Sequence, residues 1–391
     1  MKLNFTEFLI IFVVNMIDRI VLFPYYFALK LRKFLYDKGI KKSYEAAVPT
    51  ICLGNVTAGG TGKTPHSEMI LRLLLESDRW GAGNIALLSR GYKRRSKGFQ
   101  QVTVEGGAKM YGDEPVQIKR KFPSVTVAVE KDRVKGCRYL ADPQAFRSDR
   151  RAAKKCKDGN FPAADIIVLD DAFQYRRLRA RLNIVLVDYN RPVYNDSLLP
   201  IGGLRDLPER LGDADVIIVS KCPYYMDDWE KTKFAYNLGL KDFRTSEFAG
   251  TTASGKRQKV FFTTVRYEQF KPVFEDEADN RYIYSKRLVL FTGIAKDSPL
   301  IHYLSDSYKI VSKYTFPDHH SFDASDFRLI AAGVKQYPTA AVATTEKDAQ
   351  RVLDCKKIPS LLKERLFRIP IRAEFLSEAE KDAFREILAT L

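Results

Sequence analysis

A glycine-rich stretch near residue 60 has the residue types and spacing of a phosphate-binding loop. A strict loop of this kind reads G-x-x-x-x-G-K-[ST], and its glycines let backbone amides curl around a phosphate. The eight matching positions are Thr57, Ala58, Gly59, Gly60, Thr61, Gly62, Lys63 and Thr64. Only the first glycine is replaced, and the final threonine can coordinate Mg²⁺ at the start of a helix. The stretch predicts a site for a nucleotide and its metal, although a plain glycine-rich turn before a helix is the alternative.

A pair of aspartates gives a second signal of the same chemistry. The segment "ADIIVLDDAFQYRRL" is an apolar run that closes in Asp170 and Asp171. Such a run is typical of the metal-facing strand in nucleotide hydrolases and kinases. A strand that ends in two aspartates is a weak signal by itself, and the nearby glycine-rich stretch strengthens it. We therefore expect both carboxylates to take part in a Mg²⁺ site.

The elements around these residues predict a parallel α/β sheet. The run "AVPTICLGNV" before the loop is of β type, and "HSEMILRLLLES" after it has helical periodicity, so the loop joins a strand to a helix. Alternation of apolar runs with helical or loop segments favours parallel strands. Further strands are expected at residues 85–88, 125–129, 166–169, 184–187 and 216–219.

The residue pattern changes after about residue 243. The segment "KVFFTTVRYEQFKPVF" indicates a two-stranded connector, and a second set of α/β elements follows. We therefore predict a phosphate-loop NTPase-type parallel sheet domain with a second, smaller α/β domain. The expected parts are a membrane-associated helix over residues 1–44, the phosphate-loop domain over 45–250, the connector over 251–286, and the smaller domain over 287–391, which closes over the site.

The first forty residues favour contact with a membrane surface. They are rich in apolar and aromatic residues, but Asn15, Asp18 and Arg19 interrupt the roughly 18 apolar residues that a spanning helix needs. The result is an amphipathic stripe, which suits a helix lying in the bilayer surface with Tyr25 and Tyr26 at headgroup level. No small-residue cleavage site for secretion follows. The alternative is a helix that covers a domain of a soluble protein.

The overall charge points to anionic partners. Lys and Arg number 65 against 48 Asp and Glu, which gives a net charge of +17. Nucleic acid, a phosphorylated metabolite and an acidic membrane surface would all fit this balance, but no recognisable nucleic-acid-binding module is present, so we expect no nucleic-acid partner. The five cysteines are scattered without a C-x-x-C pair, which argues against a disulfide framework or a zinc site and indicates a reducing compartment.

Eight short segments together make the reading specific. In order between Pro49 and Arg351 they are "GNVTAGGTGKTP", "LSRGY", "GDEP", "LDDAFQ", "LPIGGLRD", "FTGIAK", "FPDHHSF" and "TTEKDA". This combination resembles the tetraacyldisaccharide 4'-kinase (lipid A 4'-kinase) family, in which a threonine at the position of Thr57 is normal. The resemblance implies ATP-dependent phosphorylation, with Mg²⁺, of the 4'-hydroxyl of an acylated glucosamine disaccharide 1-phosphate. It also implies a place at the cytoplasmic face of the bacterial inner membrane, with inner-membrane lipid as a partner and no obligate protein partner evident.

The resemblance also assigns roles to acidic and basic residues outside the loop. Transfer to a sugar hydroxyl is helped by a carboxylate that accepts the proton, and the family pattern makes Asp113 that base and Glu114 a metal-site carboxylate beside Thr64, Asp170 and Asp171. From the residues alone, Asp113 and Glu114 could equally be dipole partners in the first turn of a helix. His319 resembles the family histidine that orients the base, although by itself it could be an unpartnered loop residue.

Two basic residues, Lys63 and Arg205, are expected to act on the phosphate groups. Lys63 is expected to act on the phosphates in catalysis, and Arg205 to stabilise phosphate oxygens. A surface ion pair is the competing reading for Arg205. Asp206 stands where the family usually has Glu, which leaves its role open. We assign no role to "TTEKDA" beyond a possible helix start.

Two other functions would use a similar loop. A membrane-associated nucleotide-switch or partitioning ATPase shares the GG-x-GKT pattern, but such proteins carry a signature lysine at the position of Ala58. A membrane-bound nucleotide-binding scaffold without chemistry is the third reading, and the presence of Lys63, Asp113 and His319 argues against it.

Overall fold

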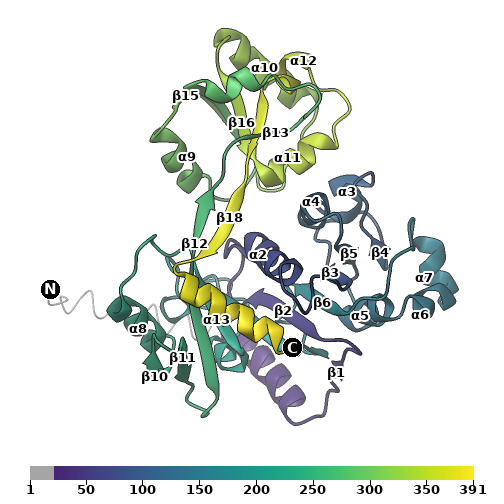
Figure 1. The fold of residues 1–391 in the computed structure, drawn as a ribbon, viewed down its shortest axis with the longest axis vertical. Coiled ribbons are helices and arrows are strands. Elements are labelled where there is room, and N and C mark those ends of the chain that lie inside the picture. Colours follow the sequence, from purple (N-terminus) through teal and green to yellow (C-terminus); the bar gives the residue numbers. More distant parts are fainter. Residues whose placement is uncertain (1–21) are drawn as a thin grey trace.

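The computed structural model describes residues 22–391, which form two lobes joined by a two-stranded ribbon (Figure 1). The larger lobe is built on an eleven-stranded sheet, whose central strands are all parallel. In spatial order these parallel strands are β12 (Arg257–Tyr267), β9 (Val216–Ser220), β8 (Leu182–Asp188), β2 (Thr50–Asn55), β6 (Ile166–Asp170), β3 (Ile85–Ser89) and β5 (Thr126–Val129). The predicted parallel α/β sheet is confirmed.

Antiparallel strands complete this sheet at its margins. They are β10 (Lys241–Arg244), β11 (Ala249–Thr251), β4 (Gln100–Gln101) and β18 (Ile371–Phe375). A separate short parallel pair joins β1 (Tyr44–Glu45) to β7 (Leu178–Arg179). The central strands are buried on both faces, which explains why they read as continuous apolar runs in the sequence.

Successive residues of one strand contribute to two different cores. Ile51 and Leu53 belong to one apolar cluster and Cys52 to the other, because side chains alternate between the faces of a sheet. Helices cover both faces. The helices of the larger lobe before residue 240 are α2 (Lys63–Leu75), α3 (Gly107–Tyr111), α4 (Asp113–Lys121), α5 (Arg133–Ala141), α6 (Pro143–Ser148), α7 (Arg150–Lys155) and α8 (Asp228–Asn237), with 3₁₀ turns at Val193–Asn195 and Pro208–Asp213.

The smaller lobe has a five-stranded, mostly parallel sheet of its own. Its strand order is β13 (Lys271–Pro272), β17 (Leu366–Ile369), β16 (Ala341–Thr345), β14 (Arg287–Thr292) and β15 (Lys309–Thr315). A 3₁₀ turn at Asn280–Tyr284 precedes β14. Its helices are α9 (Ser298–Ser305), α10 (Ala324–Gln336), α11 (Glu346–Leu353) and α12 (Ser360–Lys363).

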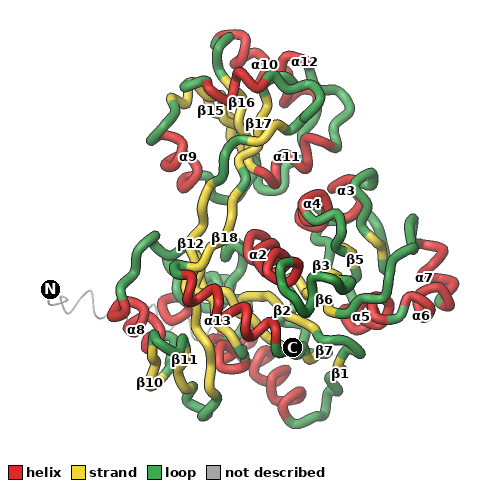
Figure 2. Tube along the Cα trace, viewed as in Figure 1, coloured by secondary structure: helices red, strands yellow, loops and turns green. Residues whose placement is uncertain are grey.

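The ribbon between the lobes differs from the predicted connector. Its first strand is β12, which begins in the large sheet beside β9 and continues toward the smaller lobe. The second strand is β18, which pairs with β12 from Thr263↔Phe375 to Tyr267↔Ile371 (Figure 2). Only one of the two strands therefore lies within residues 251–286, because the other is supplied by the chain returning from the smaller lobe.

That return also changes the extent of the smaller lobe. After β18, α13 (Glu378–Ala389) packs on the larger lobe, where Phe384 and Leu388 join one of its two cores. Trp80 donates its indole N–H to the carbonyl of Leu388 at 2.9 Å. The range predicted for the smaller domain, 287–391, thus includes a helix that belongs to the larger lobe.

The N-terminal part is helical over residues 22–37, where Leu22, Tyr25 and Leu29 pack against the larger lobe. Tyr25, predicted at headgroup level, instead donates a hydrogen bond to the carbonyl of Arg205 at 2.9 Å, whereas Tyr26 is exposed. Between residues 22 and 391, no helix has both the length and the apolar character needed to cross a bilayer. The predicted stripe of Asn15, Asp18 and Arg19 lies outside the described residues.

Candidate active site

The glycine-rich loop lies between β2 and α2, as the sequence predicts. Gly59, Gly60 and Gly62 have φ values of 68°, 63° and 83°, in the left-handed region where a side chain would be strained. Gly62 forms the N-cap of α2, and Lys63 and Thr64 begin the helix. Inside the loop, Thr61 accepts a hydrogen bond from the Asn55 side chain at 2.7 Å. The geometry leaves Gly59 and Gly60 exposed at the loop tip.

Thr57 and Ala58, at the start of the loop, pair with a neighbouring segment. Thr57 is fully buried and forms an isolated antiparallel bridge with Leu204. The amide of Ala58 donates to the carbonyl of Gly203 at 2.6 Å, and its carbonyl accepts from Arg191 at 2.9 Å. Since Thr57 pairs like a strand residue, this position has room for a side chain. This pairing accounts for the absence of the first glycine of the strict pattern.

Lys63 faces the second of the two aspartates. Its Nζ lies 3.7 Å from Asp171 Oδ1 and 3.5 Å from Asn55 Oδ1. Arg205 reaches the same carboxylate with both terminal nitrogens of its guanidinium group, Nη1 at 3.1 Å, and also bonds Asn55. Burial acts to raise the pKa of Asp171, but the hydrogen bond from Arg205 and the charge of Lys63 outweigh it, and the pKa is lowered. Lys63, Asp171 and Arg205 thus form one ion cluster behind the loop.

Asp206 has a different partner from its neighbour Arg205. Its carboxylate lies 3.4 Å from Arg210 Nε and accepts a hydrogen bond from the amide of Leu207 at 2.9 Å. Arg205 is therefore not half of a surface ion pair with Asp206. The two residues act in separate places, and Asp206 helps to anchor the segment that carries Arg205.

Asp170 is held by hydroxyl groups. It ends β6 and is 4% exposed, with Ser89 Oγ at 3.2 Å and Ser67 Oγ at 3.4 Å from its two oxygens. Burial raises its pKa to about 6, and the negative charges of Glu114 and Asp171 add to the rise. In residues 22–391, no lysine, arginine or histidine nitrogen lies within ion-pair distance of this carboxylate. Asp170 is therefore poised to accept a cation.

The predicted base and its histidine meet across the two lobes. Asp113 opens α4 in the larger lobe, and its Oδ2 lies 3.2 Å from Nδ1 of His319, which sits in a tight turn of the smaller lobe with φ 62°. Arg351 Nε is 3.6 Å from the same oxygen. Burial acts to raise the pKa of Asp113, but the hydrogen bond to His319 and the charges of Lys347 and Arg351 lower it to about 2. The carboxylate is thus ionised at neutral pH.

The second histidine of this motif has a structural task. His320 Nε2 lies 2.8 Å from Asp326 Oδ2, in the first turn of α10. This contact agrees with the sequence-based choice of His319 as the partner of the base.

Glu114, which the sequence predicts as a metal ligand, is bound to a protein cation. Its carboxylate forms an ion pair with Lys347 in α11 of the smaller lobe. Thr64, the other predicted metal ligand, is buried in the first turn of α2. Over the described part of the chain, no three His, Cys, Asp or Glu side chains gather closely enough to hold a metal ion. Glu114, Asp170 and Asp171 are thus not gathered into one ligand cluster in residues 22–391, and the metal-binding role of these residues and of Thr64 stays a prediction.

Two residues of this site were not predicted from the sequence. Both lie on α11, which begins within the segment "TTEKDA". Lys347 lies in that segment, and Arg351 comes one turn later on the same helix. Asp348 fixes the arrangement, since it accepts a hydrogen bond from the amide of Gly293 at 3.1 Å and lies 3.3 Å from Arg351. The motif was visible in the sequence, but its role depends on contacts with a helix more than 200 residues earlier.

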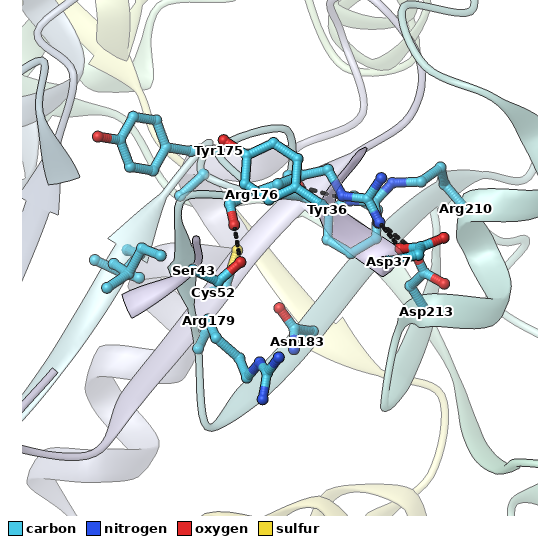
Figure 3. Close-up of a pocket in the computed structure, with 15 residues that line it drawn as sticks. Tyr36, Asp37, Ser43, Cys52, Tyr175, Arg176, Arg179, Asn183, Arg210 and Asp213 are labelled. Atoms are coloured by element: carbon cyan, nitrogen blue, oxygen red, sulfur yellow. Dashed lines mark hydrogen bonds and ion pairs between the residues drawn. The ribbon is translucent and has the colours of Figure 1, made fainter. Parts of the chain in front are cut away.

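A separate cavity of about 270 Å³ lies under the end of the N-terminal helix (Figure 3). Tyr36, Asp37 and Cys52 line it, and Arg176 and Arg210 are paired there with aspartates, Arg176 lying 2.8 Å from Asp37. The residues of the glycine-rich loop and the Asp113 to His319 pair do not line this cavity. The predicted site residues Lys63, Asp113 and His319 therefore lie outside this cavity.

Known proteins resemble this chain along nearly its whole length. The family model described as Tetraacyldisaccharide-1-P 4'-kinase matches residues 19–391. A tetraacyldisaccharide 4'-kinase of Phocaeicola vulgatus is 34% identical over 362 residues, covering 90% of this chain and 88% of the relative. One from Porphyromonas gingivalis is 36% identical over 358 residues, 90% of each.

A solved structure resembles the fold. It is a crystal structure of LpxK from Aquifex aeolicus in complex with ATP, which has a TM-score of 0.63 and 23% identity and covers 95% of this chain and 98% of that one. The match of the family model and the identities to the relatives carry the assignment: this chain belongs to the tetraacyldisaccharide-1-P 4'-kinase family.

Proposed function

We propose that this chain transfers the γ-phosphoryl group of ATP to the 4'-hydroxyl of a tetraacyldisaccharide 1-phosphate, a step in lipid A biosynthesis. The observation that carries the proposal is the contact of Asp113 with His319 at 3.2 Å across the two lobes. Lys63 of the glycine-rich loop forms a second charged group with Asp171. Family membership supplies the substrate class.

The loop is proposed to hold the nucleotide in the manner of phosphate-loop NTPases. Backbone amides of residues 59–62 and the start of α2 would surround the phosphates, because a helix N-terminus with free amides favours anions. Lys63 and Arg205 would bind phosphate oxygens, and both already lie at one carboxylate, Asp171. Positioning and charge stabilisation of this kind provide most of the catalysis in phosphoryl transfer.

The chemistry of the acidic residues suits Mg²⁺. Oxygen donors are those that this ion prefers. The buried Asp170 carboxylate has hydroxyl partners, and no lysine, arginine or histidine of residues 22–391 lies within ion-pair distance of it. We propose that Asp170 and Thr64 hold the metal, with Glu114 as a further ligand once it is free of Lys347. When bound, Mg²⁺ neutralises phosphate charge.

Asp113 is proposed to accept the proton of the sugar hydroxyl. Its pKa of about 2 keeps it ionised at neutral pH, so it is available as an acceptor when the hydroxyl attacks. His319 orients the carboxylate and can share the proton through Nδ1, while Arg351 limits its movement. Since the pair is made between lobes, the acceptor would enter at the junction of the two.

The N-terminal helix is proposed to place the enzyme at the cytoplasmic face of the bacterial inner membrane. Phe23, Phe27, Leu31 and Phe34 follow helical spacing, and each is between 45 and 63% exposed. A face of this kind suits the bilayer surface. Tyr25 on the same helix bonds the carbonyl of Arg205, so a membrane-bound helix would hold the site close to lipid substrates.

The test is transfer of labelled γ-phosphate from Mg·ATP to detergent-solubilised tetraacyldisaccharide 1-phosphate, in the wild type and in Lys63→Ala. Lipid label in the wild type that is lost in the variant is the expected result. The matched control is Lys221→Ala, because Lys221 also touches the loop, at the carbonyl of Gly60, but is paired with Asp188. Hydrolysis of ATP by the wild type without lipid label would instead favour the nucleotide-switch ATPase.

A further inference from the structure

The acidic residues predicted for the metal site differ in the side chains that they contact. Asp171 is bound to Lys63 and Arg205, both from the larger lobe. Within residues 22–391, the side chains that hydrogen-bond the Asp170 carboxylate are those of Ser67 and Ser89. Glu114 is the one whose partner comes from the other lobe, since Lys347 reaches it from α11.

Lys347 is held near these carboxylates by the start of a helix. It lies in the first turn of α11, whose N-cap Thr345 accepts a hydrogen bond from the amide of Asp348 at 3.1 Å. Its ammonium bonds Glu114 and stands near enough to Asp113 and Asp170 to feel their charges.

A second lysine at the lobe junction provides a comparison. Lys121, in α4, lies 2.8 Å from Glu68 and 2.5 Å from Glu346, the residue before Lys347. Gln117 donates to the same two glutamates, at 2.8 Å and 3.3 Å. This group ties α4 to α11 as the pair of Lys347 with Glu114 does, but it includes none of the carboxylates predicted for the metal.

Lys347 contacts the Glu114 carboxylate that the sequence predicts for the metal. An ammonium group and a divalent cation both seek the lone pairs of a carboxylate, and a glutamate held by one is less available to the other. We infer that Lys347 is a protein-supplied cation that competes with a divalent metal for Glu114. The inference rests on the proposed function, because it concerns the same site, and it assigns to "TTEKDA" a task that the sequence did not reveal.

The competition is tested by binding of Mn²⁺ alone, without nucleotide or lipid, to the full-length detergent-solubilised protein, with free Mn²⁺ measured by electron paramagnetic resonance. Lys347→Met should tighten Mn²⁺ binding about fivefold to tenfold, because it frees Glu114 and removes a nearby positive charge. Lys347→Arg, which keeps the charge, should leave the affinity near that of the wild type. Circular dichroism of each variant verifies that it is folded.

Two controls decide whether Glu114 is the cause. In Lys347→Met combined with Glu114→Gln, the gain should disappear. Lys121→Met removes the other lobe-junction lysine and should leave Mn²⁺ binding unchanged. The inference is overturned if Lys347→Met fails to tighten binding, if the gain survives in the double variant, or if Lys121→Met gives an equal gain, which would mean that loosening of the lobes is responsible.

The outcome is independent of the kinase assay. A gain in Mn²⁺ affinity at Glu114 in a protein that labels no lipid would sustain the competition and refute the proposed function. Lipid labelling together with an unchanged Mn²⁺ affinity would do the reverse.

Discussion

The pair of Asp113 with His319 makes a quantitative prediction about stability. The pKa of Asp113 is lowered from an ordinary value of 3.8 to about 2, and this difference corresponds to about 2 kcal/mol. A carboxylate with a lowered pKa stabilises the folded state above its unfolded pKa, and the contribution is lost as the pH falls through the folded pKa. Because Asp113 is 8% exposed, little of this energy is screened by solvent.

The perturbation is Asp113→Asn, which keeps the shape and removes the charge. We expect the free energy of unfolding in urea to fall by about 2 kcal/mol at pH 7 relative to the wild type, and still by about 2 kcal/mol at pH 4, but by only about 1 kcal/mol at pH 3. At pH 3 the carboxylate is largely protonated in the unfolded wild-type chain while it stays mostly ionised in the folded one, so part of the stabilisation is already lost. The same variant should lose lipid phosphorylation by about 10² to 10⁴-fold, as for removal of a general base.

The assay is urea unfolding followed by circular dichroism at the three pH values, with His319→Gln as the companion variant. That variant removes the hydrogen bond that does most to lower the pKa of Asp113, so the gap caused by Asp113→Asn should narrow in its background. The reasoning would be refuted if Asp113→Asn left the free energy of unfolding unchanged at pH 7, or if its effect on that free energy grew as the pH fell.

Three further predictions concern Asp170, Arg205 and the exposed helix face. Asp170→Asn should raise the free energy of unfolding at pH 7 by about 1 to 3 kcal/mol in metal-free buffer, because a raised pKa of about 6 means that stability is lost as the pH rises through that value; an equal stability at pH 7 in urea unfolding would count against it. Arg205→Lys should lower kcat/KM for ATP about tenfold or more, since a lysine cannot reproduce the two-nitrogen contact with Asp171, and unchanged kinetics would exclude the contact from catalysis. Replacing the apolar side chains of the N-terminal helix with serine should reduce recovery on anionic vesicles in a flotation assay while ATP binding persists; the altered residues are Phe23, Phe27, Leu31 and Phe34.

Local patterns in the sequence were enough for the large sheet and the loop. Strands that are buried on both faces must be apolar throughout, so they stand out, and the left-handed φ values of Gly59 and Gly62 require the glycines that signal the loop. The pairing of Asp113 with His319 was accessible only through family resemblance, because nothing local indicates that residues 206 positions apart will touch.

The parts that were missed depend on contacts distant in sequence. β18 pairs with a strand more than 100 residues earlier, and no feature of Ile371–Phe375 shows which partner it will take. Lys347 and Glu114 are separated by 233 positions. Tyr25 reads as an interfacial aromatic residue, yet its hydroxyl is used by the backbone of Arg205.

The return of the chain through β18 has a consequence for synthesis on the ribosome. The smaller lobe, between β12 and β18, is an insertion in the larger one, and the larger lobe acquires the core residues Phe384 and Leu388 from α13, which follows β18. A nascent chain can therefore complete the smaller lobe while Phe261 of the larger one, which packs on Phe384 with ring centres 5.5 Å apart, still lacks its cover. Emergence of α13, rather than of residue 250, is therefore the event that completes this core of the larger lobe, and a chain cut before α13 would leave an aromatic core exposed to degradation.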